Sequence, residues 1–421
     1  MNKKRYNISP MNLRIPPALQ HKRFRYLWFG LMVSVAGSQM QVAALHWHVR
    51  ELTPEPVALG AIGLARFIPV LIFSLMGGAI ADRINRRNLV LYSQFGEALI
   101  AGLLAYLTFQ NMINLSLIYT LTALQAMVMA FGGPARQALI PNLVPAKDLP
   151  NAFSLNSIAF NVGTILGPAL AGLVIGRFGQ GYTYLINAVS FFAVIWALLA
   201  MGPVMQDLPK SRTNSLVAIA DGIKFIWNNQ MIKATMIMDF FATFFASANT
   251  LMPIIARDVL QVDVIAYGWL SAAQSIGAVT AGLIISQIRE IRKQGPIFLV
   301  SVVIFGLATI LFGVSTHLAL AISALIVIGA SDAVSTIIRN TIRQLSTPDE
   351  MRGRMTSINQ IFFQGGPQLG EMEAGLAAQF FGAPFAIVSG GVGCILAVLF
   401  IMRRWPMLRA YDRTESMPTT H

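Results

Sequence analysis

Long apolar segments, separated by short polar ones, alternate along almost the whole chain. A helix rises about 1.5 Å per residue, so about 20 residues cross roughly 30 Å of hydrocarbon. Segments of that length lie near 26–48, 57–81, 89–110, 113–137, 153–177, 181–203, 233–257, 265–288, 296–315, 318–343, 355–381 and 383–402. A polar connector separates the first six from the last six. The pattern therefore predicts an all-α membrane protein with twelve transmembrane helices in two six-helix bundles.

Composition supports this class and excludes several others. Only 12% of the 421 residues are charged and 55% are hydrophobic, whereas soluble domains carry about 25% charged residues. The single cysteine, Cys394, excludes a disulfide framework and a thiolate metal site. The motifs of nucleotide-hydrolysing loops, zinc proteases and serine hydrolases are missing from the sequence. We therefore expect no enzymatic activity, no cofactor and no metal.

The positions of the basic residues explain the net charge of +13. A basic protein often binds nucleic acid, but here Lys and Arg fall in both tails and in alternate short connectors. Those connectors hold Arg83, Arg86, Arg87, Lys147, Lys210, Arg212, Lys224, Arg292, Lys293, Arg352 and Arg354. The other connectors hold only Arg50, Arg177 and Arg257. This asymmetry predicts that both termini are cytoplasmic, and it favours a topology signal over nucleic-acid binding.

The helices and connectors divide the chain into five parts. We expect a cytoplasmic N-terminal tail at 1–22, an N-terminal bundle at 23–203, a linker at 204–231, a C-terminal bundle at 232–404 and a cytoplasmic tail at 405–421. The linker contains SLVAIADGIKFIWNN. Its apolar spacing predicts an amphipathic helix at the membrane surface.

The two halves are copies of one another. An offset of 203 residues gives 14 identities in the 44 positions from 136 to 179 without a gap, and it places Arg136 on Arg339. Because each half has six helices, both copies enter the membrane in the same direction. The predicted architecture is a parallel repeat about a pseudo-twofold axis along the membrane normal. In this alignment Glu371 falls on Pro168, so an acid stands where the first half has a proline.

Charged residues inside predicted spans are costly and indicate functional sites or ion pairs. They are Arg66, Glu97, Arg136, Asp239, Asp332, Arg339, Glu371 and Glu373. Of these, we select Glu371, Glu373, Arg66, Asp239, Asp332 and Arg339 as candidates for proton coupling and gating. Arg339 follows Asp332 by seven residues and shares its helix face. These two and Asp239 either line a cavity or form a structural ion pair.

Glu371 and Arg66 are predicted to lie at the same depth. Arg66 is 16 residues from Asp82 and Glu371 is 17 residues from Arg354, which places both about 25 Å from the cytoplasmic edge. We hypothesise an ion pair between the halves that closes the outer side until a proton reaches Glu371. Glu373, about 200° away around the helix, is the alternative partner, and static helix packing is the structural alternative.

Two motifs resemble those of a known family. GGAIADRINRRN contains Gly78, Asp82, Arg83, Arg86 and Arg87 and resembles the loop between helices 2 and 3 of the major facilitator superfamily, although Asn85 stands where that family usually has glycine. The resemblance implies the twelve-helix fold and a latch role for this loop. It also implies that helices 7 and 10, which carry Asp239 and Asp332, line a central cavity.

The second motif lies on the predicted fifth helix. GTILGPALAG, with Gly163, Gly167, Pro168 and Gly172, resembles the glycine–proline motif of antiporters in this superfamily. Small residues at four-residue spacing also allow close helix packing without any transport role, so both readings stay open.

Longer stretches resemble one branch of the superfamily. HKRFRYLWFG, ALHWHVRELT and PARQALIPNLVPAKDLPNAFSLN resemble exporters of enterobactin, macrolides and multiple drugs. The resemblance implies a proton-coupled antiporter in a bacterial cytoplasmic (inner) membrane that exports a small amphipathic molecule, a siderophore or a drug. The implied partners are lipid, substrate and protons, and we expect a monomer. The alternatives are an importer or lipid transporter on the same fold, and a non-transporting receptor, which the retained loop and repeat glycines disfavour.

Overall fold

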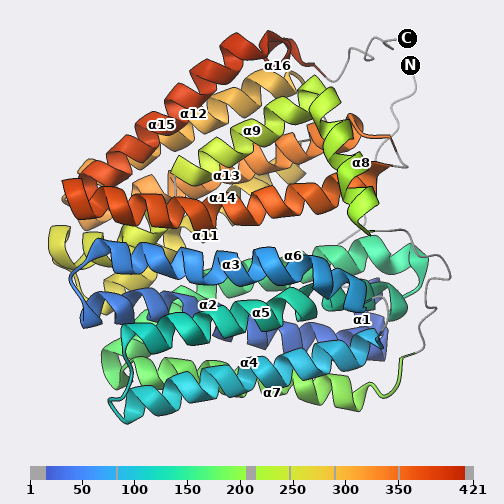
Figure 1. The fold of residues 1–421 in the computed structure, drawn as a ribbon, viewed down its shortest axis with the longest axis vertical. Coiled ribbons are helices and arrows are strands. Elements are labelled where there is room, and N and C mark those ends of the chain that lie inside the picture. The colour runs from blue at the N-terminus through green and yellow to red at the C-terminus, as the bar shows by residue number, and fades with distance from the viewer. Residues whose placement is uncertain are drawn as a thin grey trace, which may run out of the picture.

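A computed structural model describes residues 16–81, 84–204, 215–245, 248–288, 291–348 and 351–412. Within these ranges every regular element is a helix. The helices are grouped in two bundles that lie one above the other in Figure 1. The predicted all-α architecture is confirmed.

Six long helices form the first half. They are α2 (Lys22–Leu52), α3 (Pro56–Ala81), α4 (Arg86–Phe109), α5 (Leu115–Leu139), α6 (Leu149–Phe178) and α7 (Gln180–Ala200), with short α1 (Pro17–Gln20), η1 (Ile140–Asn142) and η2 (Ala146–Asp148). α2 packs against α6 and α7, while α5 packs against α3 and α4. Each of the six apolar segments predicted for this half overlaps one of these long helices.

The second half repeats this arrangement. It contains α9 (Gln230–Phe245), η3 (Ala248–Leu251), α10 (Met252–Ile254), η4 (Ile255–Val259), α11 (Val264–Ser286), α12 (Gln294–Val314), α13 (Leu318–Leu345), α14 (Arg352–Phe381), α15 (Ala383–Arg404) and α16 (Pro406–Ala410). Between the halves, α8 (Ser215–Asn228) forms where the sequence predicts an amphipathic helix.

The seventh span differs from the continuous helix predicted at 233–257. α9 ends at Phe245, and the span continues as η3, α10 and the π-helical turn η4. Pro253 lies in this second part, and a proline has no amide to donate and clashes with the carbonyl of the residue four positions before it. The proline accounts for irregular geometry in this part of the span.

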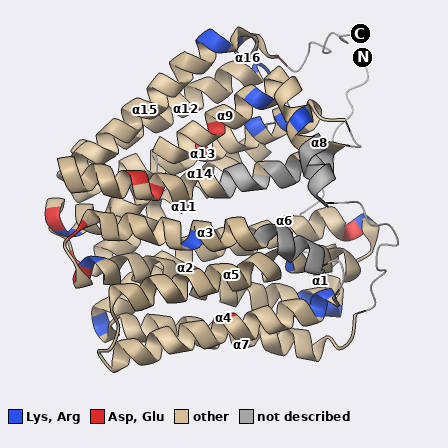
Figure 2. Ribbon diagram, in the orientation of Figure 1, with Lys and Arg blue, Asp and Glu red and all other residues tan. Residues whose placement is uncertain are grey.

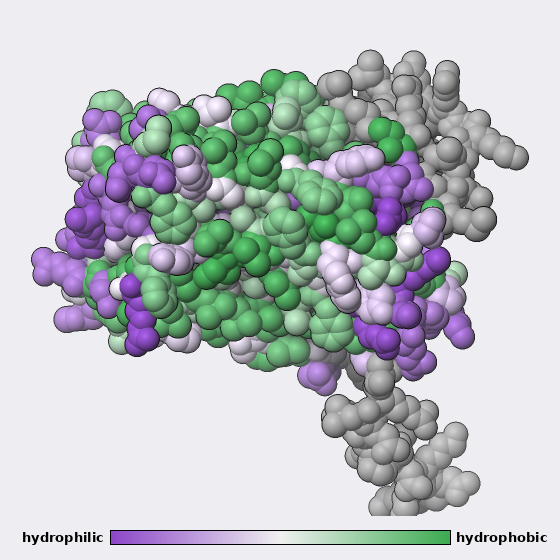
Figure 3. Space-filling model, turned by 90° about the horizontal axis from the view of Figure 1, so that it is seen from below, coloured by the Kyte–Doolittle hydropathy of each residue, from purple (hydrophilic) through white to green (hydrophobic). Residues whose placement is uncertain are grey.

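Eleven helical segments among the described residues are long and apolar enough to cross a membrane. α14, with 30 residues, is the twelfth long segment and packs along α3 and α9. Figure 3 shows an apolar band between more hydrophilic ends, and Figure 2 shows most charged residues at the two ends of the bundle. This distribution fits a chain that spans a membrane.

Two glycines of the repeat make equivalent turns. Gly179 joins α6 to α7 with φ +87°, and Gly382 joins α14 to α15 with φ +88°. Residues other than glycine rarely adopt such positive φ angles. The offset of 203 residues relates these two positions, so the repeat preserves backbone geometry as well as sequence.

The apolar core joins the halves at one end only. We call the end where Lys22 and Arg404 lie the terminal end, and the opposite one the far end. At the far end one cluster of buried apolar residues contains members of both halves, among them Leu45, Leu59, Ile255 and Leu270. At the terminal end the described clusters belong to one half each. In the described part of the chain, one apolar cluster therefore unites the halves at the far end, whereas each cluster at the terminal end belongs to a single half.

Candidate functional site

A buried cluster of charges lies in the second half. Asp239 on α9 forms ion pairs with two arginines of α13. Its Oδ1 lies 2.9 Å from Arg339 Nη2 and its Oδ2 lies 3.1 Å from Arg343 Nη2. All three side chains are only 2% exposed. Since a buried charge requires a partner, these pairs stabilise one arrangement of α9 against α13.

Arg343 extends this cluster to a third helix. It donates to the carbonyl oxygen of Thr235, at 2.8 Å, and to Asn359 Oδ1 on α14. Sequence reasoning missed Arg343 because the predicted span ends at that residue, which favoured a boundary position. The available signal was its spacing, since Arg343 follows Arg339 by one helical turn and shares its face.

Asp332 lies in a different environment from Asp239. Its Oδ1 is 3.8 Å from Arg339 Nη1, and its side chain is 44% exposed. Asp332, Thr336 and Asn340 follow one another at four-residue spacing and form a polar face on α13. A polar face on a spanning helix faces protein or water rather than lipid. Asp332 is thus accessible to a ligand or a proton, whereas Asp239 is enclosed by arginines.

The second candidate group lies where α3 of one half meets α14 of the other. A Cβ built on Gly60 would lie 2.6 Å from the carbonyl oxygen of Glu371, and one on Gly63 would lie 2.8 Å from Glu371 Cβ and Oε2. The absence of side chains at these glycines lets the backbones approach closely. The structure therefore places Glu371 directly in the interface between the halves, as its glycine-flanked position indicates.

Arg66 acts on Glu371 electrostatically from α3, but the two side chains form no direct ion pair in this structure. Glu371 Oε2 and Gln368 Oε1 are both buried, and neither has a hydrogen-bond partner among the described residues. Glu373 forms no ion pair with the described part of the chain. The predicted Arg66–Glu371 pair remains a prediction for other conformations.

The glycine–proline motif serves two helix contacts. Gly163 and Gly167 face α2 of the same half, where a Cβ on either would meet the backbone of Ala36 at 3.1 and 2.9 Å. Gly172 faces α11 of the other half, where a Cβ on Gly172 would lie 3.1 Å from the Cα of Gly268, and a Cβ on Gly268 would lie 2.7 Å from the carbonyl oxygen of Pro168. The motif thus supports close packing within the first half and between the halves.

The predicted latch loop is described only in part. Asp82 and Arg83 lie outside the described residues, and for Gly78 only the helical backbone of α3 is described. Arg86 Nη1 donates to the carbonyl of Ala138 at 3.2 Å. Arg87 donates to the carbonyl of Leu198 from Nε at 3.0 Å and from Nη2 at 2.7 Å. These two arginines tie the start of α4 to the ends of α5 and α7.

The far end contains contacts between the halves that the sequence did not indicate. Arg50 Nη2 at the end of α2 lies 2.6 Å from Asp258 Oδ2 in η4. Tyr267 on α11 donates to the carbonyl of Ala43 at 3.0 Å, and its ring packs on Trp47. An ion pair, a hydrogen bond and an aromatic contact therefore join the two halves there.

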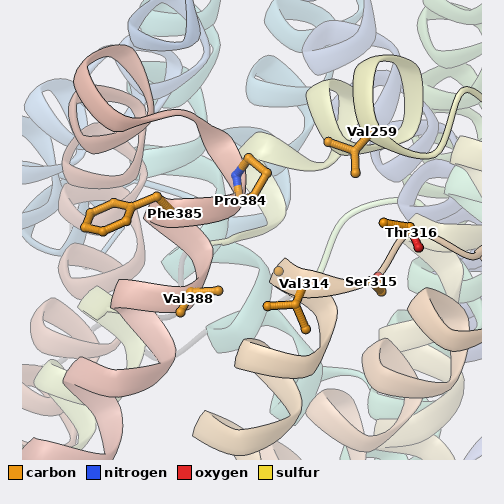
Figure 4. A pocket seen from close by; sticks show the side chains of 8 residues that line it. Val259, Val314, Ser315, Thr316, Pro384, Phe385 and Val388 are labelled. Carbon is orange, nitrogen blue, oxygen red and sulfur yellow. The ribbon is translucent and has the colours of Figure 1, made fainter.

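A hollow at the far end of the second half lacks the features of a transport site. It is lined by η4 and by the neighbouring ends of α12 and α15, including Val259, Val314, Pro384 and Phe385 (Figure 4). No charged residue lines it. Within the described ranges, no group of three His, Cys, Asp or Glu side chains is placed to hold a metal ion.

Three relatives of known function resemble this chain over most of its length. The staphyloferrin A transporter of Staphylococcus aureus (strain NCTC 8325 / PS 47) is 25% identical over 386 residues, covering 90% of this chain and 96% of the relative. The multidrug efflux pump Tap of Mycolicibacterium fortuitum is 24% identical, covering 84% and 88%. The enterobactin exporter EntS of Escherichia coli O1:K1 / APEC is 24% identical, covering 96% and 95%.

A solved structure shares the fold, and a family model covers nearly the whole chain. The bacterial homologue of the lysosomal transporter Spinster, in an inward-facing and occupied conformation, aligns with a TM-score of 0.74 and 13% identity, covering 92% of this chain and 97% of that one. The family and the relatives are membrane transporters and not enzymes. The model that describes transmembrane secretion effectors matches residues 15–421, and the chain therefore belongs to this family of major facilitator superfamily transporters.

Proposed function

We propose that this transporter exports a small amphipathic molecule, a siderophore or a drug, by alternating access in exchange for protons. The observation that carries the proposal is the asymmetry of the apolar core. One cluster unites the halves at the far end, whereas the described clusters at the terminal end are separate. With both termini cytoplasmic, as the basic connectors predict, this is the state that receives cargo from the cytoplasm.

Two glycine-lined contacts provide the surfaces about which the halves can rock. Gly60 and Gly63 of α3 face α14, and Gly172 of α6 faces Gly268 of α11. Smooth surfaces of small residues permit close approach without interlocking side chains. Rocking about these contacts opens one end of a central passage as it closes the other.

Glu371 is the proposed proton site. A protonated carboxyl group becomes a hydrogen-bond donor, and the unpartnered Gln368 Oε1 lies one turn earlier on the same helix. A carboxylate without a partner in a buried interface is unfavourable, and a proton removes its charge. Loss of the proton restores attraction to Arg66 across the interface. Proton exchange at Glu371 thereby alters the contact between the halves.

Two observations bear on the cargo and the direction of transport. The matched siderophore and drug transporters include an exporter and an efflux pump, which favours export over import or lipid transport. The charges of Arg66, Glu371 and Asp332 within the spans favour transport over a receptor role, because charged residues inside a membrane are costly and a static scaffold gains nothing from them.

Transport in inside-out vesicles tests the proposal. Vesicles that contain the full chain receive an inward-acid pH gradient and either ethidium or enterobactin as the external probe. We expect accumulation of a probe that collapses when an ionophore dissipates the gradient. Accumulation that ignores the gradient refutes proton coupling, and no movement of any probe, with the protein shown to be folded and inserted, supports the receptor alternative.

A further inference from the structure

Arg136 on α5 is the repeat counterpart of Arg339 on α13. Arg339 has three polar neighbours: Asp239 at 2.9 Å, Ser335 Oγ at 3.0 Å and Asp332 at 3.8 Å. These contacts compensate its buried charge. The two arginines occupy equivalent positions, so the partners of Arg136 in the first half can be compared directly.

Each of those partners is missing in the first half. The offset of 203 residues places Met129 on Asp332 and Gly132 on Ser335. α2 is the counterpart of α9, and it carries no acidic residue before Glu51 at its far end. Arg136 forms no hydrogen bond and no ion pair with the described part of the chain. The first half has therefore kept the arginine and lost the groups that neutralise it.

One acid acts on Arg136 through space. Glu97 on α4 influences it electrostatically but forms no ion pair or hydrogen bond with it in the described part of the chain. Glu97 is itself only 7% exposed, so its carboxylate is held inside the protein and does not reach the solvent. This interaction at a distance compensates the charge only in part, because charge pairing in a poorly solvated site requires direct contact and hydrogen bonds.

Arg136 lies near the terminal end of α5 in the first half. It follows Met129 by seven residues and so shares its face of α5, and Met129 is 51% exposed. Met129 and Asp332 are each 14 residues from the start of their helix (129 − 115 and 332 − 318), so they lie at equal depth. Arg136 lies three residues before the terminal end of α5, where the described apolar clusters do not connect the halves.

We propose that Arg136 binds an anionic group of the cargo, a carboxylate in the first instance, at the open terminal end between the halves. This inference rests on the proposed function. A guanidinium forms two parallel hydrogen bonds to a carboxylate, which supplies the contacts that Asp239 supplies to Arg339. Met129 lies seven residues before Arg136 on the same face of α5. Its exposed thioether accepts an apolar part of the same molecule. The cargo class is thus an amphipathic organic anion.

Citrate binding to the purified full-length protein in a neutral detergent tests the site. Isothermal calorimetry compares citrate, its neutral triethyl ester and the cation tetraphenylphosphonium. We expect citrate to bind the wild type and the other two compounds to bind more weakly. Arg136→Gln is expected to weaken citrate binding by about tenfold or more, since truncating one partner of a charge pair has effects of that size. Arg136→Lys is expected to fall between the two.

Two further variants separate recognition from folding. Met129→Asp leaves Arg136 in place and gives it the internal partner that Arg339 has, so it is also expected to weaken citrate binding. Arg177→Gln, which removes an exposed arginine at the far end, is expected to bind citrate as the wild type does. Equal citrate affinity in the wild type and Arg136→Gln overturns the proposal. So does preferential binding of tetraphenylphosphonium that Asp332→Asn abolishes, because the cargo is then a cation.

A lipid phosphate could supply the same oxyanion chemistry. Nanodiscs of phosphatidylcholine with and without phosphatidylglycerol distinguish the two sources. Unchanged Arg136-dependent citrate binding in both supports cargo recognition, whereas competition by phosphatidylglycerol at Arg136 assigns the site to lipid and overturns it. These measurements require no pH gradient, so a failure of proton-driven export leaves their outcome unaffected.

Discussion

Arg50 Nη2 lies 2.6 Å from Asp258 Oδ2, and this ion pair joins the end of α2 in one half to the π-helical turn of the other. The two residues are 208 positions apart in the sequence. Arg50 also donates to the carbonyl of Thr53, which fixes its side chain at the helix end. The Tyr267–Ala43 hydrogen bond also joins the two halves at this end, so an ion pair and a hydrogen bond both connect them there.

Removal of this charge pair is expected to favour opening of the far end. Asp258 is 39% exposed, so solvent screens the pair and its contribution is about 1 kcal/mol or less. An energy of that size changes a two-state population ratio about fivefold. Spin labels at Glu55 and Thr316, in a Cys394→Ala background, report the distance between the halves. Asp258→Asn should increase the fraction of molecules with the longer distance.

The matched control for this experiment is Arg177→Gln, which removes a far-end positive charge without breaking the pair. It should leave the distance distribution unchanged. An exchange of charges, Arg50→Asp with Asp258→Arg, should restore part of the closed population. If Asp258→Asn and Arg177→Gln give the same distribution as the wild type, the pair does not control the far end.

Asp239 and Asp332 are expected to differ in their effect on stability. Asp239→Asn leaves Arg339 and Arg343 without their shared counter-ion, and breaking such a buried pair costs about 3–5 kcal/mol. Asp332→Asn removes a longer contact from a 44% exposed side chain and should cost about 1 kcal/mol or less. Thermal unfolding in detergent measures both. Equal destabilisation by the two variants would show that Asp332 is as structural as Asp239.

Gly63→Ala is expected to disturb the contact between α3 and α14. The new Cβ would lie 2.8 Å from Glu371 Cβ and Oε2, so the helices must move apart, at a cost of about 1–3 kcal/mol. Gly102→Ala is the control, because a Cβ there meets nothing within 4 Å and alanine favours a helix by about 1 kcal/mol. Transport rate and unfolding temperature should fall in the first variant only. A neutral Gly63→Ala contradicts the tight interface.

The sequence predicted the features that depend on local periodicity. Apolar length located the spans, because a bilayer requires about 20 apolar residues whatever surrounds them. The seven-residue spacing of Asp332 and Arg339 predicted a shared face, because the helical repeat is fixed, and the structure places them 3.8 Å apart. The repeat aligns Gly179 with Gly382, and the structure gives both the same positive φ.

Contacts between distant helices were not predictable in this way. Asp239 meets Arg343 only because α9 packs against α13, and nothing in the period of either helix specifies that neighbour. Arg50 and Asp258 lie at helix ends, where each resembles an ordinary connector charge. The irregular geometry from Ala248 to Val259 was missed because the apolar pattern continues through it, although Pro253 was a visible signal. The unpredicted contacts depend on which helices pack against each other, and not on where the helices form.

Glu371→Gln is expected to separate transport from its proton coupling. Glutamine keeps the size of the side chain and its hydrogen-bonding ability, so the contact with Gly63 on α3 is preserved, but it cannot release a proton. In inside-out vesicles, an imposed pH gradient should no longer drive accumulation of the cargo. Exchange of labelled for unlabelled cargo, which requires no net proton movement, should continue at a rate close to that of the wild type.

Glu373→Gln is the matched control, because Glu373 lies two residues from Glu371 on the same helix but about 200° around it. Its gradient-driven accumulation should match that of the wild type. The direction of the pH effect also distinguishes the two acids. Accumulation of cargo by the wild type and by Glu373→Gln should depend on the pH of the side to which Glu371 is exposed. Accumulation by Glu371→Gln should not change with pH. Gradient-driven accumulation that survives Glu371→Gln, or that is lost in Glu373→Gln alone, rules out Glu371 as the coupling group.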